Sequence, residues 1–273
     1  MAEHGIDIQG VRHEYEIERD GARHMLSAIA EASFAIKAGE FVSLVGPSGC
    51  GKTTLLNMVA GLIEVQQGRI LLSDQPPRIG REDVAYMFAS DCLLPWRTTL
   101  RNAAFGMELR GFPHEARLAR AKELLGEAGL SGFESTYVSQ LSKGMRQRVA
   151  LARTFGLPCD FLLMDEPFGA LDPQTKLTLQ QQLLTLWEKH QGRTVLFVTH
   201  DLGEAIVMSD RVVVMSRRPA RIKADIRIDL PRPRMATELL RAPEFHRLYA
   251  YLWGELGGEI TNVEQIGANG SAQ

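Results

Sequence analysis

A glycine-rich motif near the start of the chain limits most narrowly what this sequence can fold into. The motif matches the pattern G-x-x-x-x-G-K-[ST], and its residues are Gly46, Pro47, Ser48, Gly49, Cys50, Gly51, Lys52 and Thr53. The apolar run 41–45 before it is typical of a buried strand, and residues 52–60 after it predict a helix that ends at Gly61. A strand, this loop and a helix in that order predict a phosphate-binding turn.

The chemistry of the motif suits an anion. Glycines let the backbone wrap around a phosphate with successive N–H groups pointing inward, and the start of the following helix adds a positive dipole. Lys52 supplies a positive charge for the outer phosphates, which makes it a catalytic candidate, and the Thr53 hydroxyl is a candidate ligand of Mg²⁺.

Short apolar runs alternate with helical patterns along the chain. Residues 161–164 and 195–198 are continuous apolar runs of the kind found in central parallel strands. Residues 173–190 predict a helix, and so do the apolar faces that follow Pro113 and Ser142, with Ser142 as an N-cap. The pattern predicts an α/β fold with a P-loop NTPase core. We expect a mostly parallel sheet with flanking helices, and a helical subdomain inserted at about residues 97–158.

Polar residues follow two of these apolar runs. Asp165 and Glu166 come directly after residues 161–164. Two carboxylates at the end of a buried strand cost free energy of folding, which favours a functional role for the pair. Asp165 is a candidate Mg²⁺ ligand, and Glu166 is a catalytic candidate that positions or deprotonates a water. His200 follows residues 195–198. A lone histidine is usually structural, but its place beside the same predicted crevice makes it a second catalytic candidate.

Composition indicates which partners and which cell compartment fit the chain. The chain has 273 residues and a net charge of −2, so no overall field attracts nucleic acid, and we expect no nucleic-acid partner. Cys50, Cys92 and Cys159 form neither a disulfide framework nor a zinc pattern, which favours a reducing, intracellular compartment. The sequence has no signal-peptide pattern and no apolar stretch of the roughly 18–20 residues that a membrane span needs. Work at a membrane would therefore require another, spanning chain.

The motifs then follow one another in a recognisable order. The phosphate loop precedes residues 141–148 (LSKGMRQR), 163–167 (LMDEP), 169–172 (GALD) and 199–201 (THD). In this order the chain resembles the ATP-binding subunit of ABC transporters over about residues 5–225. The resemblance implies an ABC ATP-binding domain at 1–230, with an N-terminal antiparallel β portion, and a short C-terminal extension at 231–273. Residues 218–234, which carry Pro and Arg, predict a transition out of the main core.

The resemblance also implies roles for single residues. ATP and Mg²⁺ are the implied cofactors, and two ATP molecules lie between the subunits of a dimer, which we take to be a homodimer. Ser142 and Gly144 would meet the γ-phosphate held by the other subunit, and His200 would contact that phosphate within its own subunit. Asp172 would lie in the loop that links the two sites across the interface.

Short stretches resemble one branch of this family. Residues 93–98 (LLPWRT) with Asn102, and residues 217–219 (RRP), are similar to the subunits that serve nitrate, sulfonate and taurine importers. The implied function is ATP hydrolysis to ADP and phosphate that energises solute import, by a peripheral subunit on the cytoplasmic face of the inner membrane. The implied partners are membrane-spanning permease subunits, a second ATP-binding subunit and, indirectly, an external solute-binding protein.

Tyr15 and Trp96 each allow two interpretations. The resemblance implies that Tyr15 stacks on adenine and that Thr54, next to the motif, belongs to the nucleotide-binding set. Tyr15 is equally an ordinary half-buried tyrosine near a strand edge. We expect residues 89–110 to face the permease with Leu94 and Trp96 as apolar anchors, but Trp96 is equally a core tryptophan.

Two positions depart from the family pattern. Ala89 stands where the family has a glutamine that reaches Mg²⁺ and the attacking water, and Ser90 and Asp91 are nearby candidates to replace it through a water. Lys143 stands where the signature has glycine; it either helps to neutralise phosphate or, as we favour, extends into solvent. These departures motivate an alternative function, an ATP-dependent dimerising regulatory module with weak hydrolysis.

Overall fold

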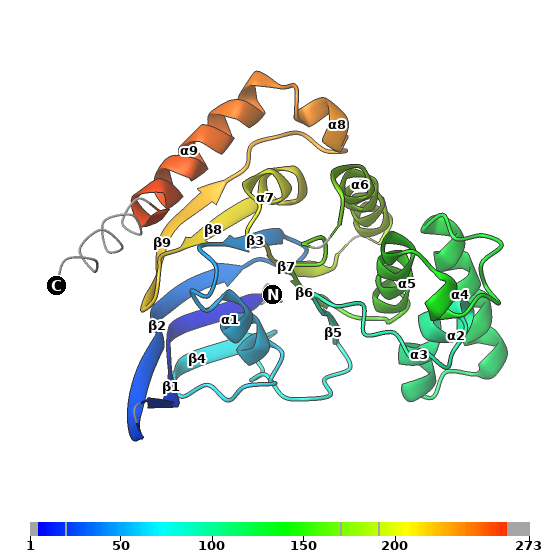
Figure 1. The fold of residues 1–273 in the computed structure, drawn as a ribbon, viewed down its shortest axis with the longest axis horizontal. Coiled ribbons are helices and arrows are strands. Elements are labelled where there is room, and N and C mark those ends of the chain that lie inside the picture. Colours follow the sequence, from blue (N-terminus) through cyan, green and yellow to red (C-terminus); the bar gives the residue numbers. More distant parts are fainter. Residues whose placement is uncertain (1–4, 20, 170, 191, 261–273) are drawn as a thin grey trace.

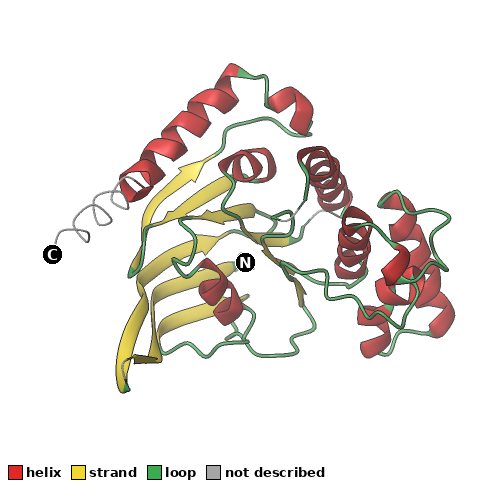
Figure 2. Cartoon of the chain, in the orientation of Figure 1, coloured by secondary structure: helices red, strands yellow, loops and turns green. Residues whose placement is uncertain are grey.

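The computed structural model describes residues 5–19, 21–169, 171–190 and 192–260, which form one sheet covered by helices (Figures 1 and 2). Within these ranges the sheet has nine strands in the order β4-β1-β2-β9-β8-β3-β7-β6-β5. The strands are β1 (Ile6–Arg19), β2 (Ala22–Ile36), β3 (Phe41–Val45), β4 (Gln67–Leu72), β5 (Val84–Met87), β6 (Phe161–Asp165), β7 (Thr194–Val198), β8 (Arg211–Met215) and β9 (Ala220–Arg227).

The neighbouring strands β8, β3, β7, β6 and β5 are parallel, and candidate site residues lie at or after the carboxyl ends of β3, β6 and β7. In β6, Leu162 enters the hydrophobic core on one face of the sheet, and Leu163 enters the core on the other. Successive side chains of a strand point to opposite faces, so a strand buried on both faces shows no polar alternation. This explains the continuous apolar runs, and it confirms the strands predicted at 41–45, 161–164 and 195–198.

Strands β1, β2 and β4 are antiparallel, which confirms the predicted N-terminal antiparallel portion. Strand β9 joins this portion to the parallel half, because it pairs with β2 on one side and with β8 on the other. The expectation that residues 218–234 lead out of the core is therefore wrong for β9. The Pro and Arg content of 218–234 is typical of a linker, but within β9 the partly buried Ile222 and Ile226 alternate with exposed Arg221 and Lys223, as in a strand.

Helices cover both faces of the sheet. They are α1 (Lys52–Val59), α2 (Thr99–Ala103), α3 (Phe105–Leu109), α4 (His114–Glu127), the 3-10 turn η1 (Val138–Gln140), α5 (Lys143–Phe155), α6 (Pro173–Lys189), α7 (Leu202–Met208), α8 (Ala236–Leu239) and α9 (Pro243–Ile260). Helix α1 packs on the face shared with the antiparallel strands, and α5, α6 and α7 pack on the other. Helices α2 to α5 group together at one side (Figure 1). The predicted helices after Pro113 and Ser142 and at 173–190 are α4, α5 and α6.

The last helices join the main core. Phe245, Leu252 and Leu256 of α9 are buried in the same core as α5, α6 and α7, and α9 contacts α7. The domain boundary at residue 230 stays a prediction. Residues 261–273 of the predicted extension lie outside the described ranges.

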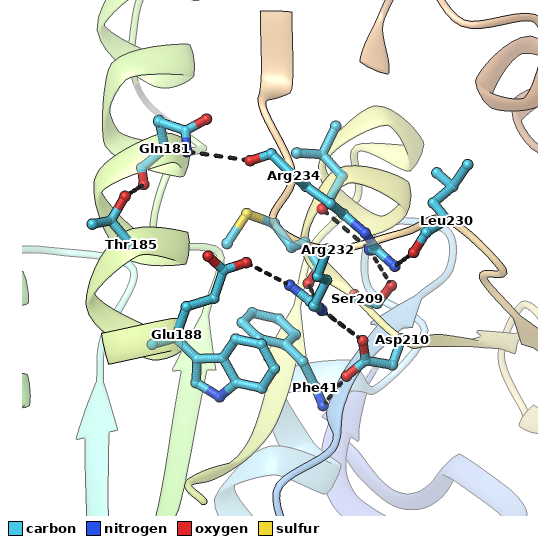
Figure 3. A network of polar contacts seen from close by, with 12 residues as sticks. Phe41, Gln181, Thr185, Glu188, Ser209, Asp210, Leu230, Arg232 and Arg234 are labelled. Atoms are coloured by element: carbon cyan, nitrogen blue, oxygen red, sulfur yellow. Dashed lines mark hydrogen bonds and ion pairs between the residues drawn. The ribbon is translucent and has the colours of Figure 1, made fainter. Parts of the chain in front are cut away.

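A buried arginine fixes the segment between β9 and α8 (Figure 3). Arg234 is 2% exposed, and its guanidinium donates five hydrogen bonds of 2.6–3.3 Å to backbone carbonyls. The acceptors are the carbonyls of Ile206, Val207, Ser209, Ile228 and Leu230. Burial, and after it the nearby charge of Arg232, lowers the pKa of Arg234 to about 10, so the group stays charged at neutral pH.

We predict that Arg234→Met lowers the free energy of unfolding by about 3 kcal/mol, because buried carbonyls lose charged donors. Urea unfolding followed by circular dichroism measures this. Arg247→Met is the matched control, since the Arg247 side chain is 75% exposed, and it should change the free energy of unfolding by less than about 0.5 kcal/mol. Equal stability of the two variants would contradict the role given to Arg234.

Candidate nucleotide site

The phosphate loop joins β3 to α1. Gly49 (φ +74°) and Gly51 (φ +115°) adopt backbone conformations that favour glycine. At Gly46, a Cβ atom would lie 2.8 Å from the carbonyl oxygen of Met215 at the end of β8, so the close approach requires glycine. Helix α1 begins after Gly51 without a side chain that caps its first N–H groups. These donors are therefore left for a ligand.

Lys52 and Thr53 are the first residues of α1. Nζ of Lys52 is buried in the loop and donates to the carbonyls of Gly46 (2.8 Å) and Pro47 (3.1 Å). It forms no ion pair with any residue that the structure describes. A buried ammonium without a counter-ion fits a site for an anion. Oγ1 of Thr53 donates to Oδ1 of Asp165 at 2.9 Å, which joins the start of α1 to the end of β6.

Asp165 is 9% exposed at the end of β6. Burial raises the pKa of its carboxyl, and the hydrogen bond from Thr53 opposes part of that rise. The adjacent oxygens of Thr53 and Asp165 are the kind of donor that a hard divalent cation prefers. Burial likewise raises the pKa of the Cys50 thiol, so Cys50 serves the loop as a protonated, packed side chain.

Glu166 and His200 meet across the ends of β6 and β7. Nδ1 of His200 lies 2.9 Å from Oε2 of Glu166. Glu166 has a φ of +42°, a strained value for a residue other than glycine, and its N–H donates to the Val198 carbonyl at 2.9 Å. At Gly169, a Cβ atom would lie 3.5 Å from Oε2 of Glu166 and 3.7 Å from Cε1 of His200. The fold thus holds a carboxylate–imidazole pair at the edge that also carries the phosphate loop.

Tyr15 of β1 is tied to α1, because its hydroxyl lies 3.0 Å from Oγ1 of Thr54. The side chain is 37% exposed, so part of its ring is available to a ligand. The ring of His13 packs edge-on against Tyr15 with centroids 4.5 Å apart. His13 is 4% exposed, and among the described residues neither of its ring nitrogens has a hydrogen-bond partner.

Ser142, Gly144 and Asp172 lie together at the starts of α5 and α6. Oγ of Ser142 accepts from the Met145 N–H (3.2 Å), and Oδ1 of Asp172 accepts from the Thr175 N–H (3.0 Å). Hydrogen bonding from Thr175, by its side chain first and then by its backbone N–H, lowers the pKa of Asp172. At Gly144 a Cβ atom would lie 2.6 Å from Cγ2 of Thr175, so the two segments touch. In the described part of the chain, none of the three hydrogen-bonds with residues 46–53 of its own phosphate loop.

The loop after β5 carries the unusual Ala89, which is exposed. Oδ2 of Asp91 accepts from Nε of Arg146 at 3.0 Å, and the Ser90 hydroxyl bonds within the loop. Both candidates to replace the missing glutamine are therefore engaged elsewhere. Lys143, the other departure, is exposed at the start of α5.

Two basic residues near the site were not predicted. Arg218, in the turn after β8, donates to the carbonyl of Gly49. Lys176 of α6 pairs with Asp201 (2.7 Å) and Glu204 (2.6 Å), just after His200. Their places in the sequence could have indicated both residues. Arg218 closely follows an apolar run that resembles the other strands, and Lys176 lies one helical turn after Asp172.

Known proteins are similar to this chain in sequence and in fold. A family profile described as ABC transporter matches residues 29–169. An uncharacterized ABC transporter ATP-binding protein of Methanocaldococcus jannaschii is 46% identical over 214 residues, which cover 78% of this chain and 80% of that protein. The chain belongs to the ABC transporter family.

Other members of the ABC transporter family resemble the chain over most of its length. The taurine import ATP-binding protein TauB of Shigella flexneri is 39% identical over 229 residues, 82% of this chain and 89% of that protein. The solved dimer of the ATP-binding cassette MJ0796, in a post-hydrolysis state with ADP and Pi, aligns with a TM-score of 0.72 at 28% identity. It covers 83% of this chain and 100% of its own. The predicted ABC fold is confirmed. None of the helices described for this ABC chain is long and apolar enough to cross a bilayer.

The burial of His13 in this ABC domain makes the free energy of unfolding depend on pH. Burial lowers the pKa of His13 in the folded state, whereas the unfolded chain has the ordinary value of about 6.5. As the pH falls below about 6.5, the unfolded state binds this proton more readily, so the free energy of unfolding decreases. We predict that His13→Phe, which keeps a ring against Tyr15, loses stability less steeply than wild type between about pH 7.5 and pH 5.5.

Thermal unfolding across that range measures the effect. His114→Phe is the control, because His114 is exposed and should keep the wild-type slope. Equal slopes in the wild type and His13→Phe would contradict the assignment to His13.

Proposed function

We propose that this chain is the ATP-hydrolysing subunit of a membrane importer for a small solute such as nitrate, a sulfonate or taurine. The observation that carries the proposal is the convergence at one sheet edge of the unpaired Lys52 ammonium, the Thr53–Asp165 contact and the Glu166–His200 pair. The similarity to a protein named for taurine import supports the solute class. The relatives from Methanocaldococcus jannaschii and Shigella flexneri are named as ATP-binding proteins of a transporter and of taurine import, and neither name describes a regulatory module. The alternative, a dimerising regulatory module with weak hydrolysis, therefore gains no support.

The residues fit ATP and Mg²⁺. The uncapped N–H groups at the start of α1 and the Lys52 ammonium would hold the phosphates. Thr53 and Asp165 would hold Mg²⁺, which neutralises phosphate charge when bound. Glu166 would orient a water for in-line attack on the γ-phosphorus, and His200 would fix the Glu166 carboxylate and contact the γ-phosphate.

We propose that a second copy of the chain completes each site. Ser142, Gly144 and Asp172 form no hydrogen bond with their own phosphate loop among the described residues, and the solved cassette MJ0796 is dimeric. Ser142 and Gly144 of one copy would meet the γ-phosphate held by the other, and Asp172 would lie at the interface. Tyr15, with its partly exposed ring beside Thr54, would stack on adenine.

An exposed apolar surface is the proposed permease contact. Trp96 is 71% exposed, so it is not a core tryptophan, and Leu94 is partly buried beside it. Phe88, in the loop between β5 and α2 that also carries Trp96, lines a separate cavity of about 430 Å³ together with the exposed Leu62, Ile79 and Leu109. Contiguous exposed apolar groups mark interaction surfaces. A permease bound here would hold the chain at the cytoplasmic face of the inner membrane as a peripheral subunit, with a solute-binding protein acting on the permease from outside.

We also propose a division of the chain into a domain and an extension. We assign residues 1–230 to the ABC ATP-binding domain, with residues 97–158 as its helical subdomain, and residues 231–273 to an extension. The grouping of α2 to α5 at one side supports the subdomain (Figure 1). The burial of Leu252 and Leu256 indicates that the extension stabilises the domain on which it packs.

We predict that Glu166→Gln binds ATP like the wild type but hydrolyses it at least about 100-fold more slowly, because an amide is a poor base for the attacking water. Lys52→Ala should instead weaken ATP binding at least about tenfold, because it removes the ammonium from the loop. Phosphate release with Mg²⁺-ATP measures turnover, and titration with a fluorescent ATP analogue measures binding. Full turnover in Glu166→Gln would refute its role, and a wild type that binds no ATP would refute the proposed function.

We predict that Trp96→Ala leaves ATP turnover and melting temperature close to wild type, since the side chain is exposed, but weakens assembly with the permease. Co-purification with tagged permease subunits measures assembly. Trp253→Ala is the matched control, because Trp253 is 51% exposed on α9 and outside the proposed surface. Equal recovery of permease with both variants would rule out Trp96 as an anchor.

A further inference from the structure

An ion cluster that includes a buried carboxylate lies beside His200. Nζ of Lys176, on α6, lies 2.7 Å from Oδ2 of Asp201 and 2.6 Å from Oε1 of Glu204. Glu204 is 3% exposed, and its second oxygen accepts a hydrogen bond from the Thr199 hydroxyl. Asp201 caps α7 by accepting from the Glu204 N–H at 3.1 Å. One lysine therefore connects α6 to the start of α7.

The cluster holds both chain neighbours of His200. Thr199, before it, is 1% exposed, and its hydroxyl accepts from the Asp201 N–H at 3.0 Å. Asp201, after it, pairs with Lys176. The His200 side chain is itself 53% exposed, so packing does little to fix it. Its direction toward Glu166 depends on the backbone that these contacts anchor.

Lys176 is the cation on which the cluster depends. A carboxylate as buried as that of Glu204 is costly without a compensating charge, and the Asp201 carboxylate shares the same ammonium. Without Lys176 the two carboxylates would repel each other, and the turn 199–204 would relax away from α6. Because Asp172 caps α6, the same lysine also joins this turn to the segment expected at the dimer interface.

We propose that Lys176 is a positioning residue for hydrolysis, which holds residues 199–204 against α6 and so sets the His200 imidazole against Glu166. The inference rests on the proposed ATPase function. It adds to that function a residue outside the phosphate-binding motifs, which acts through His200 and does not touch the nucleotide.

The first test compares Lys176→Met, Lys176→Arg and Lys189→Met. Lys176→Met should lower kcat about 10- to 100-fold, the effect of a misplaced catalytic group, with KM for ATP within about twofold. Lys176→Arg keeps a charged donor and should stay within about threefold of wild type. Lys189→Met removes another lysine of α6, one paired with Glu127, and should keep full turnover.

In Lys176→Met the buried Glu204 carboxylate loses its counter-ion, which destabilises the folded protein. The double variant Lys176→Met/Glu204→Gln is therefore tested beside it. It removes both charges and leaves an amide oxygen to accept from Thr199. A double-mutant cycle with His200→Ala, followed by single-turnover hydrolysis, decides the route of the effect. If Lys176 acts through His200, Lys176→Met adds less than about twofold to the loss caused by His200→Ala.

A readout without turnover separates this inference from the proposed function. In ¹⁵N-histidine NMR spectra of the nucleotide-free protein, His200→Ala identifies the His200 signal, and Lys176→Met should shift or broaden it while Lys189→Met leaves it in place. An unmoved His200 signal, or fully additive losses in the cycle, would overturn the positioning role. Absent turnover in the wild type would refute the proposed function alone, because the NMR comparison would still decide the inference.

Discussion

Strand β3 is hydrogen-bonded in parallel to β7 on one side and β8 on the other, and the whole site depends on that placement. Parallel strands end at the same edge, so the phosphate loop after β3, Asp165 after β6 and His200 after β7 gather there from distant parts of the sequence. Both faces of these strands are buried, which fixes their register. The rigid sheet can then support local strain at Glu166 and uncapped N–H groups at α1.

Much of this site could be predicted from sequence, because its main residues directly follow strand patterns. Asp165 and His200 lie within two positions of an apolar run, and the glycine-rich motif with Lys52 starts directly after another; the parallel sheet brings these local patterns together in space. Lys176 and His13 could not be predicted in the same way. Lys176 pairs with Asp201 of another element, and His13 is buried where β1 pairs with β2, so the importance of each depends on tertiary contacts that no local pattern encodes.

Strand β9 shows a different limit of sequence analysis. It lies within residues 218–234, whose prolines and arginines resemble a linker in composition, yet the alternation of partly buried and exposed residues in β9 is that of a strand. Pairing with β2 and β8 makes it the joint between the two halves of the sheet. Arg234 then ties the chain that follows to the core by hydrogen bonds that the sequence does not reveal (Figure 3).

The loop that carries Ala89 is held in place although it lacks the glutamine expected from the family pattern. Asp91 pairs with Arg146 of α5, so the loop is connected to the helix that Ser142 caps. Loss of one preorganised polar group aimed at a transition state costs roughly 3 kcal/mol. The remaining Lys52, Asp165 and Glu166 set is complete, so we expect slower chemistry at the same site and not a different ligand.

In the proposed dimer, one copy of the chain supplies the phosphate loop and a second copy supplies the signature segment. The most direct measurement is an experimental structure of the Glu166→Gln protein with ATP and Mg²⁺. We predict a dimer in which each nucleotide contacts Lys52 and Thr53 of one copy and Ser142 and Gly144 of the other. A nucleotide held by a single copy, with Ser142 and Gly144 turned away from its γ-phosphate, would contradict this arrangement.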